Sequence, residues 1–249
     1  MRKMVAALAC RNQGSRLYGK PLQNLDIDQG KCILDNIVEC LSGFECIDSI
    51  VLGIAEGSDN LSFIDYAKRK NLDYILGDEK DVLGRLIQCG EHSAATDIFR
   101  MTSESPFPYY EMIDTCWLHH LERQNDATFV DNIIDGCGFE IIHLDALKKS
   151  HSLGLEKHRS ELCTLYIREN KSDFKLGTLS PPEKLMRKDI RFTVDYPEDL
   201  IVCRAVFNEF KDKAPFIPLD DAVRFLDKNE KLKSLLAPFC EFGYATMYL

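Results

Sequence analysis

The feature that most constrains the fold is the regular alternation of short apolar runs and amphipathic segments in the first half of this 249-residue chain. The apolar runs are typical of buried strands, and CILDNIVECLSGF places its apolar residues on one helical face. Strands that alternate with helices of about ten to fifteen residues indicate βαβ units and a parallel sheet covered on both faces. The expected strands are 4–9, 49–55, 73–77, 97–102 and 127–132, and the expected helices are 32–44, 58–70, 82–94 and 111–124.

The second half of the chain breaks this rhythm. The stretch DFKLGTLSPPEKLMRKDIRFTVD alternates like a strand, a turn and a strand, and Pro181-Pro182 marks the turn. We therefore expect a single domain over 1–249 with a hairpin or arm inserted at about 138–190, a common place for dimerisation or for contact with a second substrate. The other expected elements are strands at 138–144 and 191–195 and helices at 145–153, 157–170, 196–210 and 219–237.

Composition narrows the class of protein. The chain is 45% hydrophobic, which is enough for a sizeable core, and its net charge of −9 argues against nucleic acid as a generic partner. It has no apolar run near the ~20 residues of a membrane span, and the short run MVAALA is followed at once by charge, unlike a signal peptide. The ten cysteines are scattered without a CxxC pair, which is typical of a reduced cytoplasmic protein.

The stretch ACRNQGSRLYGKPLQNL resembles a phosphate-binding P-loop with one defect. Gly14 and Gly19-Lys20 match the GxxxxGK[ST] pattern, but Pro21 stands where that loop needs a hydroxyl for Mg²⁺. The residues that follow also lack the apolar stripe of a helix. The first 25 residues nevertheless contain no acid and five bases, so we interpret the loop as a different anion site rather than a solvated terminus. The five bases are Arg2, Lys3, Arg11, Arg16 and Lys20.

Three polar loops are expected at one edge of the predicted sheet. In open α/β sheets, ligands bind beyond the carboxyl ends of the strands. That edge collects the loops at 10–21, at 77–81 (GDEKD) and at 103–108 (SESPFP). We therefore place the candidate ligand site there.

Five stretches, in order along the chain, resemble the cytidylyltransferase family that includes CMP-KDO synthetase, and most closely its spore-coat polysaccharide biosynthesis protein F branch. The loop around Arg11, Arg16 and Gly19-Lys20 is similar to the family's A-R-x-x-S-T-R-L-P-G-K-x-L. The others are GDEKDVLGRL, FRMTSESPF, DGCGFEIIHLDAL and RFTVDYPEDL, and the matches run from residue 5 to about 207. Five ordered matches are more specific than any one of them.

The resemblance implies a Rossmann-like nucleotide-diphospho-sugar transferase fold, with a mostly parallel sheet and helices on both faces. It also implies transfer of a nucleotidyl group from CTP or another NTP to a sugar acid or sugar phosphate, with release of pyrophosphate and with Mg²⁺ as cofactor. Such a transfer accumulates negative charge on phosphorus and on the leaving pyrophosphate, so catalysis depends mostly on positioning and on cations. A homodimer is expected.

Several site residues follow from the loop chemistry and the resemblance. Arg11, Arg16 and Lys20 are the candidate catalytic cations. Glu104 and Asp195, at two predicted strand ends, are the candidate Mg²⁺ ligands, although a solvated loop acid and a helix N-cap are the alternatives. The candidate acceptor-binding residues are Asp135 and Glu140, and the candidate nucleotide-binding residues are Leu8, Ala9, Cys10, Asn12, Gly14, Ser15, Gly77, Asp81, Val82, Arg85, Thr102 and Ser103.

The sequence departs from the family pattern at four places, one of which is the loop glycine position, where Gln13 stands and Gly14 follows one place later. Tyr18 replaces a proline, Ser103-Glu104 replaces Gly-Asp and so lengthens the carboxylate arm, and Leu162 falls on a family histidine. The changes at Ser103, Glu104 and Leu162 leave a non-catalytic nucleotide-binding regulator open as an alternative. The base-reading loops at 8–13 and 77–85 leave a second alternative open, a guanylyl- or uridylyltransferase on the same scaffold. Neither base preference nor acceptor can be read from the sequence.

Overall fold

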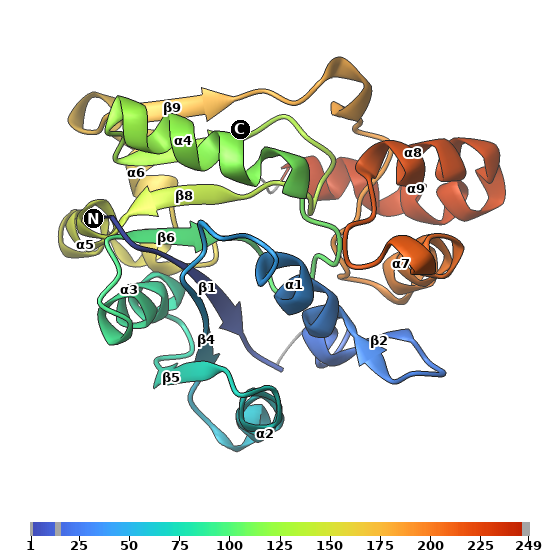
Figure 1. Cartoon of the computed structure of the whole chain (residues 1–249), viewed down its shortest axis with the longest axis horizontal. Coiled ribbons are helices and arrows are strands. Elements are labelled where there is room, and N and C mark those ends of the chain that lie inside the picture. Colours follow the sequence, from blue (N-terminus) through green and yellow to red (C-terminus); the bar gives the residue numbers. More distant parts are fainter. Residues whose placement is uncertain (1, 13–15, 246–249) are drawn as a thin grey trace.

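One seven-stranded sheet runs through the middle of the molecule (Figure 1). The computed structural model describes residues 2–12 and 16–245. The strand order is β5-β4-β1-β6-β8-β7-β9, and a small ribbon of β2 and β3 stands apart. The strands are β1 (Met4–Cys10), β2 (Asn24–Asp26), β3 (Lys31–Cys32), β4 (Ser49–Ala55), β5 (Asp73–Gly77), β6 (Asp97–Arg100), β7 (Ala127–Val130), β8 (Glu140–His143) and β9 (Leu176–Leu179).

The sheet is mostly parallel, as expected, and the predicted fold class is confirmed. Strands β5, β4, β1 and β6 run parallel, and β7 runs parallel to β9. Among the strands of this sheet in residues 2–12 and 16–245, only β8 runs antiparallel to its neighbours, β6 and β7. Central β1 is apolar on both faces, as a strand covered by helices on both sides must be.

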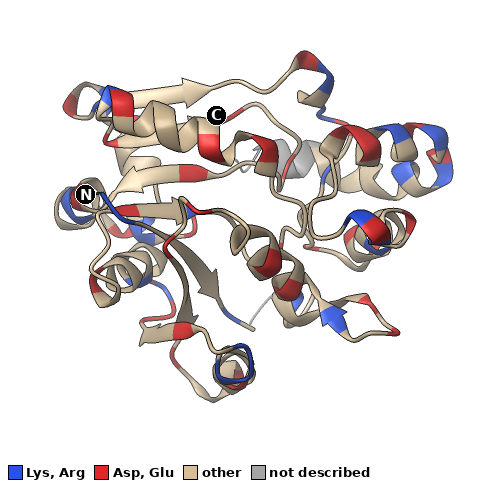
Figure 2. Ribbon diagram, viewed as in Figure 1, with Lys and Arg blue, Asp and Glu red and all other residues tan. Residues whose placement is uncertain are grey.

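Two hydrophobic cores lie on opposite faces of the sheet. Helices α1, α2, α4, α7 and α8 pack on the face that carries Leu8 and Phe99, while α3, α5 and α6 pack on the face of Val5 and Ile98. The helices are α1 (Ile33–Leu41), α2 (Leu61–Lys70), α3 (Val82–His92), α4 (Ile113–Arg123), α5 (Leu144–Leu153), α6 (Leu165–Glu169), α7 (Pro197–Glu209), α8 (Leu219–Lys228) and α9 (Glu230–Ala245). Figure 2 shows that the central strands carry few charged positions, whereas α8 and α9 carry many.

The hairpin predicted for residues 173–195 is wrong. Its first strand, β9, joins the main sheet beside β7 instead of pairing with a later strand. The stretch 191–195 does not return to the sheet as a strand; it makes a single bridge, from Arg191 to Asp135. Gly136 permits this close approach, because its φ is +89° and a Cβ there would lie 2.4 Å from the backbone N of Thr193.

Two predicted helices are also interrupted. The 157–170 helix splits into a short 3₁₀ turn at Glu156–Arg159 and α6, because His158 accepts a hydrogen bond from the N–H of Leu155 and is held there by Glu169. The 219–237 helix is two helices, with Asn229 between α8 and α9.

The remaining sequence expectations concern cysteines and membrane spans. All ten cysteines are free, and all but Cys46 are buried, as expected for small apolar residues. Among residues 2–12 and 16–245, no helix is both long and apolar enough to cross a bilayer.

Candidate active site

The loop after β1 brings Lys20 to a carboxylate from the far end of the chain. Gly19 adopts a left-handed conformation with a φ of 59°, and its N–H donates to the carbonyl of Asn12 at 3.1 Å. This turn starts the 3₁₀ helix Lys20–Leu22, in which Pro21 fits because the first turn needs no N–H donor. The Nζ of Lys20 lies 2.5 Å from Oδ1 of Asp195. Gln13, Gly14 and Ser15, and with them the predicted anion nest, lie outside the described residues.

Asp195 is fixed by the N-terminus of α7. The Oδ2 of Asp199 accepts the N–H groups of both Asp195 and Tyr196, each at 2.9 Å, which satisfies two donors that the helix leaves free. Pro197 occupies the first helical position. The predicted alternative, that Asp195 is itself the N-cap, is therefore wrong: Tyr196 is the N-cap, and the side chain of Asp195 is available for other contacts.

Arg191 lies directly behind Asp195. Its side chain is 1% exposed, and its Nη2 is 2.5 Å from the Oδ2 of Asp195. The Nε lies 3.6 Å from Asp135 and 3.5 Å from Asp199, so one guanidinium serves three carboxylates. Sequence reasoning missed Arg191 and Asp199. The sequence pattern could have indicated Arg191. Apolar residues alternate with Arg191 and Asp195, as in an extended segment with one buried face, and these apolar residues are Ile190, Phe192 and Val194.

Glu104 joins the same cluster from the loop after β6. Its backbone carbonyl accepts the N–H of Val194 at 3.1 Å, and the preceding Ser103 donates from Oγ to the carbonyl of Ala9 at 2.7 Å. The loop after β6 is thus tied both to β1 and to the segment before Asp195. The two predicted metal carboxylates, far apart in sequence, are brought to one place.

The cluster holds more negative charge than its cations neutralise. Burial raises the pKa of Glu104, Lys20 opposes the rise, and Asp195 adds to it. Burial also raises the pKa of Asp135, to about 6, although Arg191 acts in the opposite direction. Burial alone would raise the pKa of Asp195, but the cations around it, above all Lys20, hold the pKa below its usual range. An additional cation would therefore be stabilised here.

The donor set fits Mg²⁺. Carboxylate oxygens are the ligands that this hard ion prefers, and it retains waters and binds phosphate oxygens in the rest of its shell. Glu104 and Asp195 would supply the protein oxygens. No group of three or more His, Cys, Asp or Glu side chains with metal-binding geometry occurs within residues 2–12 and 16–245.

The other predicted cations lie around this cluster. The guanidinium of Arg16 sits 4.9 Å from the ring centre of Tyr196, and that ring stacks on Phe239 at 4.0 Å. Arg11 is exposed and pairs with Glu161 at 3.6 Å. By contrast, Arg2 and Lys3 are at the amino end of β1, about 20 Å away at the ~3.3 Å rise of a strand residue. The five basic residues of the N-terminus therefore do not form one patch.

Arg85 and Asp81 hold the loop that was predicted to bind the nucleotide. Arg85 is 1% exposed, and its guanidinium donates to the carbonyls of Gly53, Asp78 and Glu79. Asp81 caps α3 by accepting the N–H of Gly84 at 2.8 Å and also contacts His151. The structure places both side chains in supporting positions; Gly77 and Val82 flank them at the end of β5 and the start of α3.

Glu140 lies in a separate network on the α6 side of the sheet. Its carboxylate contacts Arg100 at 3.3 Å, Thr164 at 2.6 Å and Arg168 at 2.9 Å. Arg168 also forms a bidentate pair with Asp131. The structure therefore does not bring Glu140 together with Asp135, the other predicted acceptor residue, which faces Arg191.

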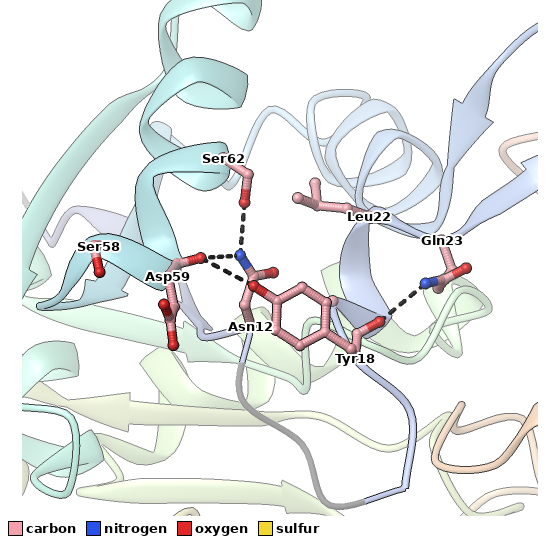
Figure 3. Close-up of a pocket in the computed structure, with 8 residues that line it drawn as sticks. Asn12, Tyr18, Leu22, Gln23, Ser58, Asp59 and Ser62 are labelled. Carbon is pink, nitrogen blue, oxygen red and sulfur yellow. Dashed lines mark hydrogen bonds between the residues drawn. The ribbon is translucent and has the colours of Figure 1, made fainter.

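An open pocket of about 510 Å³ lies between the β1 loop and the start of α2 (Figure 3). The amide of Asn12 donates to Ser62 at 2.7 Å, and Tyr18 and Gln23 are joined by a hydrogen bond of 2.9 Å. Among the predicted nucleotide-binding residues that the structure describes, Asn12 is the one that lines it. Leu8, Cys10 and Thr102 do not line this pocket; Leu8 and Cys10 are buried in β1, and Thr102 bonds Ser105.

Comparisons with known proteins agree with this fold. No family model matches the chain. It is 29% identical over 235 residues to an uncharacterized protein of Methanocaldococcus jannaschii, with 94% of each chain covered. It is 23% identical over 231 residues to the spore coat polysaccharide biosynthesis protein SpsF of Bacillus subtilis, covering 92% of this chain and 96% of that protein.

Two solved structures extend the comparison. A cytidylyltransferase from Leptospira borgpetersenii superposes with a TM-score of 0.83 at 20% identity, covering 93% of this chain and 97% of that one. A CMP:2-keto-3-deoxy-manno-octonic acid synthetase complexed with CTP gives 0.62 at 13% identity, covering 83% and 99%. The predicted nucleotide-diphospho-sugar transferase fold is confirmed, because the chain shares its fold with a cytidylyltransferase and with a CMP:2-keto-3-deoxy-manno-octonic acid synthetase. The predicted resemblance to the spore-coat polysaccharide biosynthesis protein F branch is confirmed by the similarity to SpsF.

Proposed function

We propose that the protein transfers CMP from CTP to a sugar acid or sugar phosphate and releases pyrophosphate, with Mg²⁺ as cofactor. The observation that carries the proposal is the convergence of Lys20, Asp195 and Glu104, from three distant segments, beyond the carboxyl ends of β1 and β6. This is the edge where parallel α/β sheets bind their ligands. The names of the similar proteins support the same class of substrate.

The reaction needs charge stabilisation more than covalent chemistry. An in-line attack on the α-phosphorus of CTP places negative charge on the transferred group and on the leaving pyrophosphate. Lys20 and Arg16, on the loop after β1, supply cations for the triphosphate. Glu104 and Asp195 would hold Mg²⁺, which when bound neutralises the α-phosphate and orients the attacking oxygen.

Lys20 and Asp195 neutralise each other while no nucleotide is present. Their ion pair, at 2.5 Å, keeps a lysine and a carboxylate satisfied at a site where both are only 21% exposed. A triphosphate offers Lys20 a stronger anion, and its accompanying cation offers Asp195 a new partner. The ion pair thus holds both side chains near the positions they would use with substrate.

Pyrophosphate release tests this function. Purified protein would be incubated with Mg²⁺, each of CTP, UTP, GTP and ATP, and a panel of sugar acids and sugar phosphates. We expect the highest rate with CTP; a higher rate with GTP or UTP would assign the alternative base. Failure to bind any of the four nucleotides, together with no turnover across the panel, would contradict the proposal. Nucleotide binding without turnover on any acceptor would favour the regulator.

Association through the 138–190 region remains a prediction. Leu153 and Leu155, at the end of α5 and just beyond it, are 58% and 67% exposed. Sedimentation equilibrium of the wild type and of Leu155→Glu would test whether this region joins two copies. A wild-type monomer would refute the homodimer.

A further inference from the structure

The two oxygens of the Asp195 carboxylate have different kinds of partner. Lys20, which pairs with Oδ1, has a side chain that is 21% exposed and comes from a surface loop. Arg191, which pairs with Oδ2, has a side chain that is 1% exposed and lies in the core. A lysine ammonium is a point charge on a flexible stem, whereas a guanidinium is a rigid planar fork. One partner can move away, and the other cannot.

Arg191 is itself held from several sides. Its Nη1 donates to the carbonyl of Phe239 in α9 at 3.2 Å. On its other edge, Nε faces Asp135 and Asp199 at 3.6 and 3.5 Å, and this Nε has no hydrogen bond among the described residues. The guanidinium therefore sits between two acids without a short contact to either. Its one short ion pair in the described part of the chain is with Asp195.

We propose that Arg191 is a positioning residue: it holds Asp195 through Oδ2, so that Oδ1 alone exchanges its partner when nucleotide binds. In the free protein that partner is Lys20. In the complex it is the cation that accompanies the triphosphate. This inference rests on the proposed function, and it assigns Arg191 no contact with the substrate.

The arrangement explains why an arginine is needed here. A carboxylate that lost Lys20 and had no second partner would rotate about its side-chain torsions, and its orientation toward a cation would be lost. Outer-shell partners of metal-binding carboxylates serve to prevent this, and their mutation typically costs about 10- to 100-fold in metal affinity or activity. A lysine at 191 would keep the charge but not the fixed geometry.

The test compares the affinity for CTP in Mg²⁺ and in EDTA. Calorimetry would be carried out on the wild type, Arg191→Lys and Arg191→Gln. Arg187→Gln is the matched control, because Arg187 also pairs with two carboxylates, Asp189 and Asp227, on an exposed part of the surface. Circular dichroism would establish that each variant is folded, and kcat and KM would be measured at saturating Mg²⁺.

We expect the Mg²⁺-dependent gain in CTP affinity to fall about 10- to 100-fold in both Arg191 variants. Affinity in EDTA should change little, the KM for CTP in Mg²⁺ should rise as the affinity falls, and Arg187→Gln should match the wild type. Wild-type Mg²⁺ dependence in folded Arg191→Lys would overturn the proposal. So would failure of both Arg191 variants to fold, since Arg191 would then be a folding residue. A wild type that binds no CTP in either buffer would instead refute the proposed function.

Discussion

The two ends of strand β1 each carry a buried group of charged residues, and the two groups differ in how well they are satisfied. At the amino end, Asp97 is fully buried and accepts hydrogen bonds from Arg2, His120 and Thr96, which lower its pKa to about 2 despite its burial. At the carboxyl end, Asp135 is nearly as buried, but its pKa is raised to about 6. A buried aspartate carboxylate is therefore stabilised in its charged form at the amino end of β1 and destabilised in that form at the carboxyl end.

This contrast separates a structural group of charges from the proposed functional one. The charge of Asp97 is balanced by groups of the protein itself, so a bound cation would add little stabilisation there. The acids around Arg191 share one buried guanidinium, and the Oδ1 of Asp199 has no hydrogen bond among the described residues. Perturbed carboxylates with unmet electrostatic needs are typical of sites whose partners arrive with substrate. We therefore expect substitutions at the two ends of β1 to differ in their effects on turnover and on stability.

The largest effect is expected for Lys20→Ala. Loss of one preorganised cation should reduce turnover by on the order of 10²–10³ and weaken nucleotide binding. The matched control is Lys3→Ala at the other end of β1, where Nζ donates to the carbonyl of Ser93; its kinetics should match the wild type. Wild-type turnover in Lys20→Ala would show that the loop is only a solvated basic segment.

The amino-end group should respond in stability rather than in turnover. Asp97→Asn leaves Arg2 without its carboxylate partner and should lower the free energy of unfolding at pH 7 by about 3 kcal/mol, with kcat unchanged in the folded protein. Since the folded pKa is low, the stability from Asp97 is present above about pH 4 and is lost as the pH falls toward 2. Urea unfolding across this range measures both; a change below about 1 kcal/mol would contradict the assignment.

The carboxyl-end group should show the opposite pH dependence. Because the pKa of Asp135 is raised to about 6, the native state binds its proton more tightly than the unfolded chain, so stability falls as pH rises from about 4 to 6. In Asp135→Asn this fall should disappear, and the variant should be more stable than the wild type at pH 7 by about 3 kcal/mol at most. Destabilisation at pH 7 would show that the ion pair with Arg191 outweighs burial.

The sequence predicted which edge of the sheet carries the candidate site, but it did not predict the order of all the strands in the sheet. Strand positions follow from local apolar runs. The pairing of Glu104 with Asp195 followed from the family resemblance, because residues 191–195 form no strand of the sheet. Strand order depends on tertiary packing, so neither the insertion of β8 between β6 and β7 nor the place of β9 could be read from local patterns. The hairpin failed for the same reason.

The charge cluster shows a second limit. Arg191 and Asp199 lie in one motif, but their contact depends on the turn that begins α7 and on Gly136 admitting the chain. Arg2 and Lys20 seemed part of one basic segment, and a single extended strand separates them. A run of basic residues in the sequence therefore predicts an anion-binding patch only where the fold brings those residues close together.

The most direct test of the account is the Mg²⁺ dependence of pyrophosphate release in Glu104→Gln. This substitution keeps the size of the side chain and removes its charge. If Glu104 and Asp195 share the metal, turnover should fall strongly, the Mg²⁺ concentration for half-maximal rate should rise about tenfold or more, and nucleotide affinity without metal should change little or increase. An unchanged half-saturating Mg²⁺ concentration would remove Glu104 from the site and contradict the shared carboxylate pair.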